Sequence, residues 1–245
     1  SALPAALPPR APREVPPLVM ARAFFLGSGL LYLWLGFRLG NAGALMSWLG
    51  LSLFIIGLAY LVGSASLMGK RRDGSFHPLG LLVHAPFLLA AWLAWQLRRR
   101  RAEAAWNEVA PGIFVGRMSP PGALPPGEPW VIDLTCELIP PRRVRGERYR
   151  CLPTLDGTAP AAAPFWALVR EVAALEAPLF IHCAAGHGRS ATLAAAVIVE
   201  RGLAADVDAA EAMMRRHRPR VALGRAQRAL VVARAPAPPA RRPSP

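Results

Sequence analysis

The chain has 245 residues, 53 % of them hydrophobic, and its mean hydropathy is +0.30. This hydropathy is high for a protein without membrane segments, so we first look for apolar runs long enough to cross a bilayer. The 29 Lys and Arg against 15 Asp and Glu give a net charge of +14, which suits an anionic membrane surface or a phosphorylated substrate. The sequence has no zinc-finger spacing and no RNA-binding aromatic motif, so we expect no nucleic-acid partner.

The N-terminal part is dominated by apolar runs. Residues 1–17 are rich in Pro and Ala, which predicts a disordered tail. Within residues 18–101, three apolar runs cover 23–37, 44–68 and 78–97. The first run gives only about 22 Å of helix against a hydrocarbon core of about 30 Å, but flanking arginines can extend its reach by snorkelling. We therefore predict an all-α transmembrane segment of two or three helices, with membrane lipid as a partner.

Basic residues follow the second and third runs, at positions 70–72 and 98–101. Positive residues favour the cytoplasmic side of a membrane, so three spans would place these two groups on opposite sides. Either the third run is interfacial or re-entrant, or the four arginines at 98–101 outweigh the basic loop at 70–72 in setting the orientation of the chain. We expect three spans, a multi-pass membrane protein and a C-terminal domain in the cytoplasm.

Residues 106–232 combine mixed charges with short apolar runs separated by Pro and Gly, which is typical of a soluble α/β domain. The following tail, 233–245, is rich in Pro, Arg and Ala and is predicted to be disordered. We expect a central sheet flanked by helices. The predicted strands are 113–115, 130–134, 149–153 and 179–182, and the predicted helices are 164–176, 190–201, 206–216 and 224–232.

One segment, LFIHCAAGHGRS at 179–190, joins a predicted strand to a predicted helix through a tight loop. Such a loop turns backbone N–H groups inward, and the helix points its positive N-terminal end at the same place, so the two form a cradle for a phosphate. Cys183 lies at its base, where the same dipoles stabilise the nucleophilic thiolate. Arg189 has a planar fork that matches two phosphate oxygens, and Ser190 can hydrogen-bond the sulfur as it leaves.

The residues between Cys183 and Arg189 are expected to bind the phosphate through their backbone; they are Ala184, Ala185, Gly186, His187 and Gly188. The two glycines are expected to allow backbone geometry that a Cβ would block. His182 is expected to orient the loop. The sequence leaves open whether His187 touches substrate or faces solvent.

The order His182-Cys183, five residues, Arg189-Ser190 resembles the signature of the Cys-based protein tyrosine phosphatase superfamily, and residues 106–232 are similar to its dual-specificity branch. The resemblance implies a phosphotyrosine-phosphatase-like fold and hydrolysis through a phosphocysteine, without metal or cofactor. It also implies a general acid, and Asp156 fits because it follows a predicted strand 27 residues before Cys183. The alternative is that Asp156 belongs to a plain Asp-Gly turn.

Four other residues could suggest further chemistry. Asp133 is expected to be a strand-end hydrogen-bonding residue rather than a second acid. Cys136 and Cys151 are expected to be structural thiols; a regulatory disulfide between Cys151 and Cys183, implied by some relatives, is the alternative. Gln227 is expected to pack within a helix rather than to position water.

The sequence supports a membrane-anchored phosphatase with two competing substrate classes. The membrane helices favour a phospholipid headgroup, such as phosphatidylglycerol phosphate or a phosphoinositide. The loop lacks the Lys or Arg that lipid-acting relatives tend to carry, so we expect a phosphoprotein substrate, with the phospholipid as the alternative. A catalytically silent phosphate-binding module is a third hypothesis, but Cys183, Asp156 and Arg189 are all present. A sulfur transferase of the rhodanese type also uses a Cys loop, but its loop does not require the Arg-Ser ending, so the sequence speaks against this function.

Overall fold

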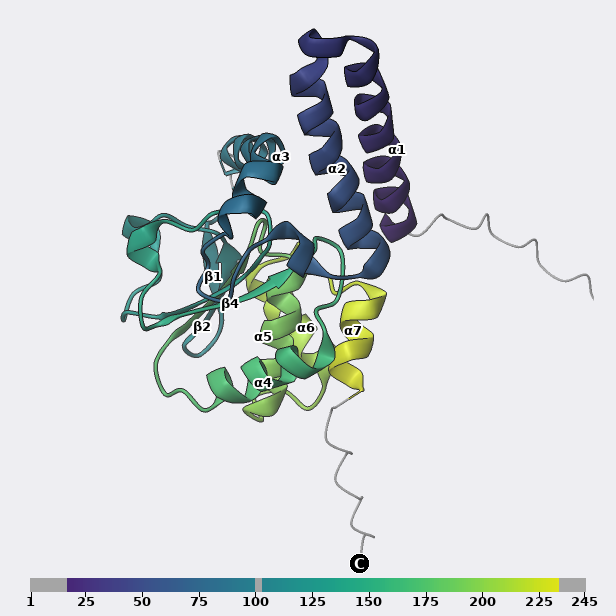
Figure 1. Cartoon of the computed structure of the whole chain (residues 1–245). Coiled ribbons are helices and arrows are strands. Elements are labelled where there is room, and N and C mark those ends of the chain that lie inside the picture. Colours follow the sequence, from purple (N-terminus) through teal and green to yellow (C-terminus); the bar gives the residue numbers. More distant parts are fainter. Residues whose placement is uncertain (1–16, 100–102, 234–245) are drawn as a thin grey trace, which may run out of the picture.

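The computed structural model describes residues 17–99 and 103–233, and Figure 1 shows a helical part above an α/β domain. Both predicted tails lie almost entirely outside the described residues. Helices α1 (Pro17–Arg38) and α2 (Ala44–Val62) form a hairpin, and α3 (Pro78–Arg98) follows. All three helices are long and apolar enough to cross a membrane, as expected for a membrane segment.

Small residues let α1 and α2 approach closely. A Cβ on Gly29 would lie 2.6 Å from the backbone N of Phe54, and one on Gly50 would lie 2.6 Å from the backbone N of Leu33. The hydrophobic effect does not bring helices together within lipid, so a membrane hairpin is stabilised by close van der Waals packing of this kind. The glycines recur every seven residues along the hairpin, at Gly29, Gly36, Gly43, Gly50 and Gly57.

The second helix is shorter than the apolar run 44–68 that predicted it. It ends at Val62, and Gly63 adopts the left-handed conformation with φ +68° that commonly terminates helices. The chain then forms a short 3-10 helix, Ala65–Met68, and Met68 packs against Ile56 on α2. The extra apolar residues of the run therefore lie against the hairpin rather than lengthening it.

Helix α3 does not continue the hairpin as a third parallel member. In Figure 1, α1 and α2 stand upright in the plane of the picture, whereas α3 is seen nearly along its axis. Two polar contacts with α2 come from its N-terminal half: Trp48 Nε1 donates to the carbonyl of Leu82 at 3.0 Å, and Ser52 Oγ lies 3.2 Å from His84 Nδ1. The C-terminal half of α3 leads away from the hairpin over the α/β domain.

The α/β domain contains a five-stranded sheet in the order β1-β2-β5-β3-β4. The β1–β2 pair is antiparallel, and the other neighbours are parallel. Every residue of the central strand β5 is buried. Strand β1 was not predicted from the sequence, because its first three residues are only partly buried or exposed and give no clear apolar run. The strands are β1 (Trp106–Ala110), β2 (Ile113–Arg117), β3 (Trp130–Thr135), β4 (Tyr149–Thr154) and β5 (Leu179–Cys183).

Four helices pack on one face of this sheet and enclose the main hydrophobic core (Figure 1). A second apolar cluster on the sheet includes Phe114, Tyr149 and Phe180, packed against Leu124 and Val144 from the segments between the strands. The predicted α/β class, a sheet flanked by helices behind an apolar helical segment, is confirmed. The helices are α4 (Ala162–Ala173), α5 (Arg189–Glu200), α6 (Val207–His217) and α7 (Arg225–Val232).

The loop between α2 and α3 joins the membrane part to the free edge of the sheet. The backbone N–H of Cys151 on β4 donates to the carbonyl of Arg72 at 3.1 Å, and Lys70 and Phe76 form an antiparallel bridge within the loop. A Cβ on Gly74 would lie 2.4 Å from the Tyr149 hydroxyl. The loop therefore covers the edge strand β4, which would otherwise expose unpaired backbone groups.

Candidate active site

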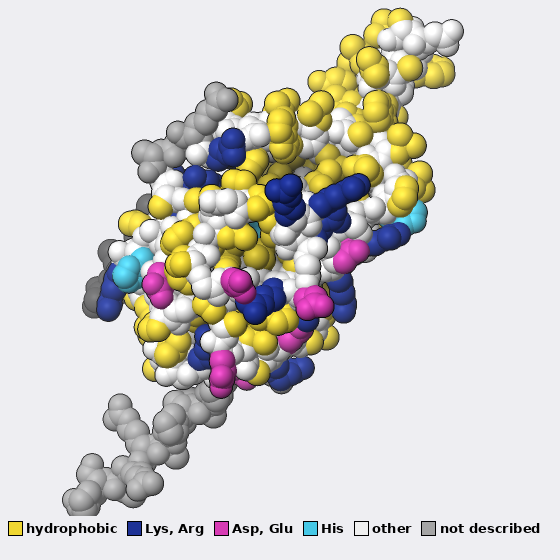
Figure 2. Space-filling view, turned by 90° about the vertical axis from the view of Figure 1, so that its left-hand side faces the viewer, with side chains coloured by type: hydrophobic (Ala, Val, Ile, Leu, Met, Phe, Trp, Pro, Cys, Tyr) yellow, Lys and Arg dark blue, Asp and Glu magenta, His cyan; other side chains and the backbone are white. Residues whose placement is uncertain are grey.

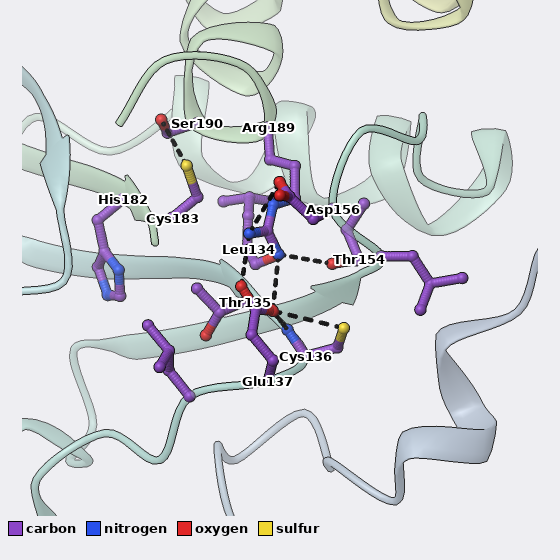
Figure 3. Close-up of polar contacts among 12 residues, drawn as sticks. Leu134, Thr135, Cys136, Glu137, Thr154, Asp156, His182, Cys183, Arg189 and Ser190 are labelled. Atoms are coloured by element: carbon purple, nitrogen blue, oxygen red, sulfur yellow. Dashed lines mark hydrogen bonds and ion pairs between the residues drawn. The ribbon is translucent and has the colours of Figure 1, made fainter. Parts of the chain in front are cut away.

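The β5–α5 loop holds the Cys183 sulfur among hydrogen-bond donors. The backbone N–H of Gly186 donates to Sγ at 3.2 Å, and Ser190 Oγ lies 3.4 Å from it (Figure 3). The carbonyl of Cys183 accepts from Met118 N at 2.8 Å, which fixes the end of the strand. The residue is 3 % exposed. Donors gathered around a sulfur favour the thiolate, the form that acts as nucleophile.

The two loop glycines have different roles. Gly186 has φ +82°, and a Cβ there would lie 2.5 Å from the carbonyl carbon of Gly116, so this position requires glycine. Gly188 has φ −109°, which other residues adopt, and a Cβ there would lie 3.4 Å from Gln227 Oε1. The expectation that both glycines serve backbone geometry is therefore wrong for Gly188.

Arg189 opens α5, and its guanidinium is buried beside the loop (Figure 3). Nη1 donates to the Thr154 carbonyl at 2.8 Å and to Glu137 Oε2 at 2.9 Å, while Nη2 donates to Glu137 Oε1 at 2.6 Å. Nη2 also lies 3.2 Å from Asp156 Oδ1. Among the described residues, nothing hydrogen-bonds the buried Nε. A buried donor without a partner beside an anion-binding loop is the arrangement that a phosphate oxygen would complete.

Glu137 is a site residue that sequence analysis missed. Burial alone would raise the pKa of Glu137, but the charge of Arg189 and its hydrogen bonds hold that pKa below its usual value. The resulting bidentate pair fixes the plane of the guanidinium. Glu137 lies in the turn after β3, 52 residues before Arg189, and no local pattern distinguishes it from other turn residues.

Asp156 lies in the turn after β4 and is 74 % exposed at its side chain. Two distant residues hold this turn: the Tyr60 hydroxyl on α2 donates to the Asp156 carbonyl at 3.1 Å, and Gln227 Nε2 on α7 donates to the Thr158 carbonyl at 2.9 Å. The turn therefore places a solvent-exposed carboxylate next to Arg189.

His182 and Asp133 lie behind the nucleophile. His182 Nδ1 is 3.9 Å from Asp133 Oδ1, and burial lowers the pKa of His182, so its ring is neutral near pH 7. Asp133 accepts from the Tyr149 hydroxyl at 2.8 Å and pairs with Lys70 Nζ at 2.8 Å. This carboxylate is a buried hydrogen-bonding group, as expected, but its ion pair with Lys70 was not predicted.

Two residues that were not predicted from the sequence, Arg218 and Glu103, hold the outside of the loop. Arg218, which is buried, donates to the carbonyls of Gly186 and Ala185, both at 2.9 Å. His187 neither faces open solvent nor points freely toward substrate, because its Nε2 lies 2.9 Å from Glu103 Oε1. Because Arg218 holds the carbonyls of the loop outward, the N–H groups of the loop are directed to its interior.

A disulfide between Cys151 and Cys183 does not suit this fold. Cys151 lies on β4 and Cys183 on β5, with β3 between them. Two strand spacings separate the strands by about 9–10 Å, whereas the Cα atoms of a disulfide lie within about 7 Å. Burial also raises the pKa of the Cys151 thiol to about 12. Both observations favour the structural role predicted for Cys151.

A chamber of about 610 Å³ lies between the membrane helices and the catalytic loop. Its walls are mainly apolar and come from all three helices, with Phe25 on α1, Ile56 on α2 and Ala91 on α3 among them. Arg98 also lines it. The parts of its lining that belong to the α/β domain include Glu137, Asp156 and Ala184, so the membrane helices roof the candidate active site.

A buried cysteine in a phosphate-sized loop, with an arginine opening the following helix, defines the class of Cys-dependent phosphatases. Residues 153–233, about a third of the chain, match the family model described as protein-tyrosine phosphatase. This match confirms the resemblance seen in the signature, and it identifies a protein-tyrosine phosphatase region in the C-terminal part of the chain.

Similar solved structures include PTPMT1 in complex with PI(5)P, at 17 % identity and a TM-score of 0.46, covering 53 % of this chain and 93 % of that chain. The human tyrosine phosphatase-like serine/threonine/tyrosine-interacting protein has 19 % identity and a TM-score of 0.45, with coverages of 53 % and 94 %. A putative dual specificity phosphatase of mouse has 19 % identity and a TM-score of 0.39, with coverages of 54 % and 87 %. No curated protein matches the sequence significantly.

Proposed function

We propose that this protein hydrolyses a phosphate monoester on a phospholipid headgroup. The observation that carries the proposal is the apolar chamber, which extends from the membrane helices to the edge of the phosphate loop. Its volume lies in the range of ordinary ligand sites. A lipid could place apolar chain in this chamber while its phosphate reaches Cys183 and Arg189.

The sequence of the loop favours a phosphoprotein, because no basic residue lies between Cys183 and Arg189. The chamber supplies a positive charge from another element, since Arg98 at the end of α3 lines it. These observations favour the lipid, and hydrolysis of phosphoprotein becomes an outcome of the test.

The proposed chemistry has two steps. The Cys183 thiolate attacks phosphorus, an S–P bond forms, the P–O bond to the lipid breaks, and Asp156 gives its proton to the leaving oxygen. Arg189 and the loop N–H groups stabilise the transferring phosphoryl oxygens. Water then attacks the phosphocysteine, Asp156 takes up the water's proton, and sulfur leaves as a thiolate that Ser190 Oγ can hydrogen-bond at 3.4 Å.

Narrowing the chamber should impair lipid hydrolysis selectively. Ala91→Phe adds a ring to the chamber wall and is expected to lower kcat/KM for phosphatidylglycerol phosphate in mixed micelles by roughly tenfold, the cost of about 1.4 kcal/mol of lost binding. Turnover of p-nitrophenyl phosphate, which needs only the phosphate loop, should stay within about twofold. Leu93→Phe, at a half-exposed position of the same helix that does not line the chamber, is the matched control.

The same assay should include a phosphotyrosine peptide and a phosphoinositide. A peptide hydrolysed with higher kcat/KM than either lipid, at a rate that Ala91→Phe leaves unchanged, would overturn the lipid proposal and restore the phosphoprotein hypothesis. The two lipids distinguish glycerol phosphate from inositol phosphate headgroups.

We also propose that the α1–α2 hairpin enters the bilayer while α3 lies along its surface. Helix α3 crosses the hairpin direction, and Figure 2 shows a hairpin almost free of charged side chains, with Lys and Arg gathered where it meets the domain. Exposed apolar residues of α3, such as Leu89 and Leu93, would contact lipid, and Arg99 stacks over Trp95 at its end. This arrangement puts both basic groups on one side and removes the conflict that three spans create.

Reporter fusions at each end of the full chain test this topology. Two spans predict that N-terminal and C-terminal fusions to a reporter active only in the cytoplasm are both active or both silent. Three spans, the expectation from sequence, predict opposite behaviour of the two fusions, and that result would contradict an interfacial α3.

A further inference from the structure

Lys70 belongs to the loop between two membrane helices, yet its ammonium group lies inside the phosphatase domain. Its side chain and that of Asp133 are both 0 % exposed. Nζ donates to Asp133 Oδ2, to Thr135 Oγ1 and to the carbonyl of Leu138, each at 2.8 Å. An ammonium has three N–H donors, so this geometry uses all of them.

These acceptors lie close to the two parts of the catalytic site, the nucleophile and the phosphate-binding arginine. Asp133 Oδ1 faces His182, whose neighbour in sequence is the nucleophile, and it also accepts from the N–H and hydroxyl of Thr135 at 2.7 Å. Thr135 and Leu138 lie on either side of Glu137, which holds the guanidinium of Arg189. One cation therefore joins Asp133, which faces the residue before the nucleophile, to the turn that orients the arginine.

We infer that Lys70 is a positioning residue for catalysis, so that the loop between α2 and α3 completes the phosphatase domain. It neutralises Asp133 behind His182 and anchors the turn that carries Glu137. The inference concerns the phosphate loop itself and holds whether the substrate is a lipid or a protein.

The electrostatic part of this role follows from burial. Burial alone would lower the pKa of Lys70 and raise that of Asp133, but their mutual attraction outweighs burial and moves both pKa values the other way, so both groups are charged. The other titratable groups around Asp133 are Tyr149 and Cys151 on β4 and His182 on β5. Of these, only His182 can take up a proton and become a replacement cation.

The test uses the full chain in detergent micelles with p-nitrophenyl phosphate. Lys70→Met should lower kcat by roughly 10- to 100-fold, since small misplacements of catalytic groups have costs of this size. Its pH–rate profile should gain an ionisation that wild type lacks, because unpaired Asp133 then holds a proton on His182 above the usual His pKa of about 6.5. Arg71→Met, an exposed neighbour in the same loop, should match wild type in both measurements.

The double variant Lys70→Met/Asp133→Asn carries no unpaired buried charge and covers the case in which Lys70→Met does not fold, as judged by circular dichroism. It should keep a lowered kcat, because the turn remains unanchored, and it should lose the added ionisation. The inference is overturned by a folded Lys70→Met with wild-type kcat and pH profile, or by a double variant with wild-type kcat. A lowered kcat in Lys70→Met without the added ionisation would show a structural role only and would also overturn it.

Discussion

Replacing Cys183 by Ser is expected to lower the turnover of p-nitrophenyl phosphate by at least about 1,000-fold, because the attacking group is lost. The Gly186 N–H at 3.2 Å and the Ser190 hydroxyl at 3.4 Å can stabilise an anion on sulfur, whereas a serine hydroxyl stays protonated near neutral pH and is a poor nucleophile. Phosphate release by the full chain, measured in detergent with EDTA present, gives the comparison.

The matched control is Cys151→Ser, which changes a buried thiol two strands away and should keep most of the activity. The Cys183→Ser variant should still bind vanadate, since the loop N–H groups and Arg189 remain. Turnover by Cys183→Ser close to that of wild type would require another nucleophile. A folded wild type that binds vanadate without turnover would instead identify a phosphate-binding module.

The catalytic loop could be predicted because its parts are contiguous in sequence. A buried strand, a tight turn and a helix N-terminus bring Cys183 and Arg189 together through local geometry alone. Asp156 could be proposed because it follows a predicted strand at a plausible separation. In the structure its carboxylate lies 3.2 Å from Arg189, and this proximity could not be predicted from the sequence.

The supporting residues could not be predicted, because each reaches the loop from a distant part of the chain. Glu137 meets Arg189 only because β3 and β5 are neighbours in the sheet. Arg218 holds the loop from beyond α6, and Glu103 does so from just before β1. In the sequence, such residues look like ordinary surface charges, since nothing nearby marks them as buried or paired.

The membrane segment shows the same division between local and long-range information. Length and hydropathy sufficed to predict three apolar helices. The direction of α3 depends on its packing against α2 and on the attachment of the preceding loop to β4, neither of which hydropathy records. For the same reason, a phosphatase domain cut at residue 106 would omit Lys70 and leave Asp133 as a buried charge without its partner.

Asp156→Asn is expected to lower the hydrolysis of a lipid phosphate by roughly 100- to 10,000-fold, the usual range for losing a general acid. An alkoxide is a poor leaving group and needs a proton as the P–O bond breaks, whereas p-nitrophenolate leaves readily without one. The loss on p-nitrophenyl phosphate should therefore be much smaller. Comparing kcat for the two substrates in the same micelles measures this difference within one variant.

Asp208→Asn is the matched control for this test, because Asp208 is 78 % exposed and pairs with an arginine, Arg228, much as Asp156 is 74 % exposed beside Arg189. It should leave both activities unchanged. An equal loss on both substrates in Asp156→Asn would mean that Asp156 acts only through the fold of its turn. Because Tyr60 and Gln227 hold that turn through backbone carbonyls, the side-chain change leaves both contacts in place, and a selective loss on the lipid can then be assigned to the missing proton.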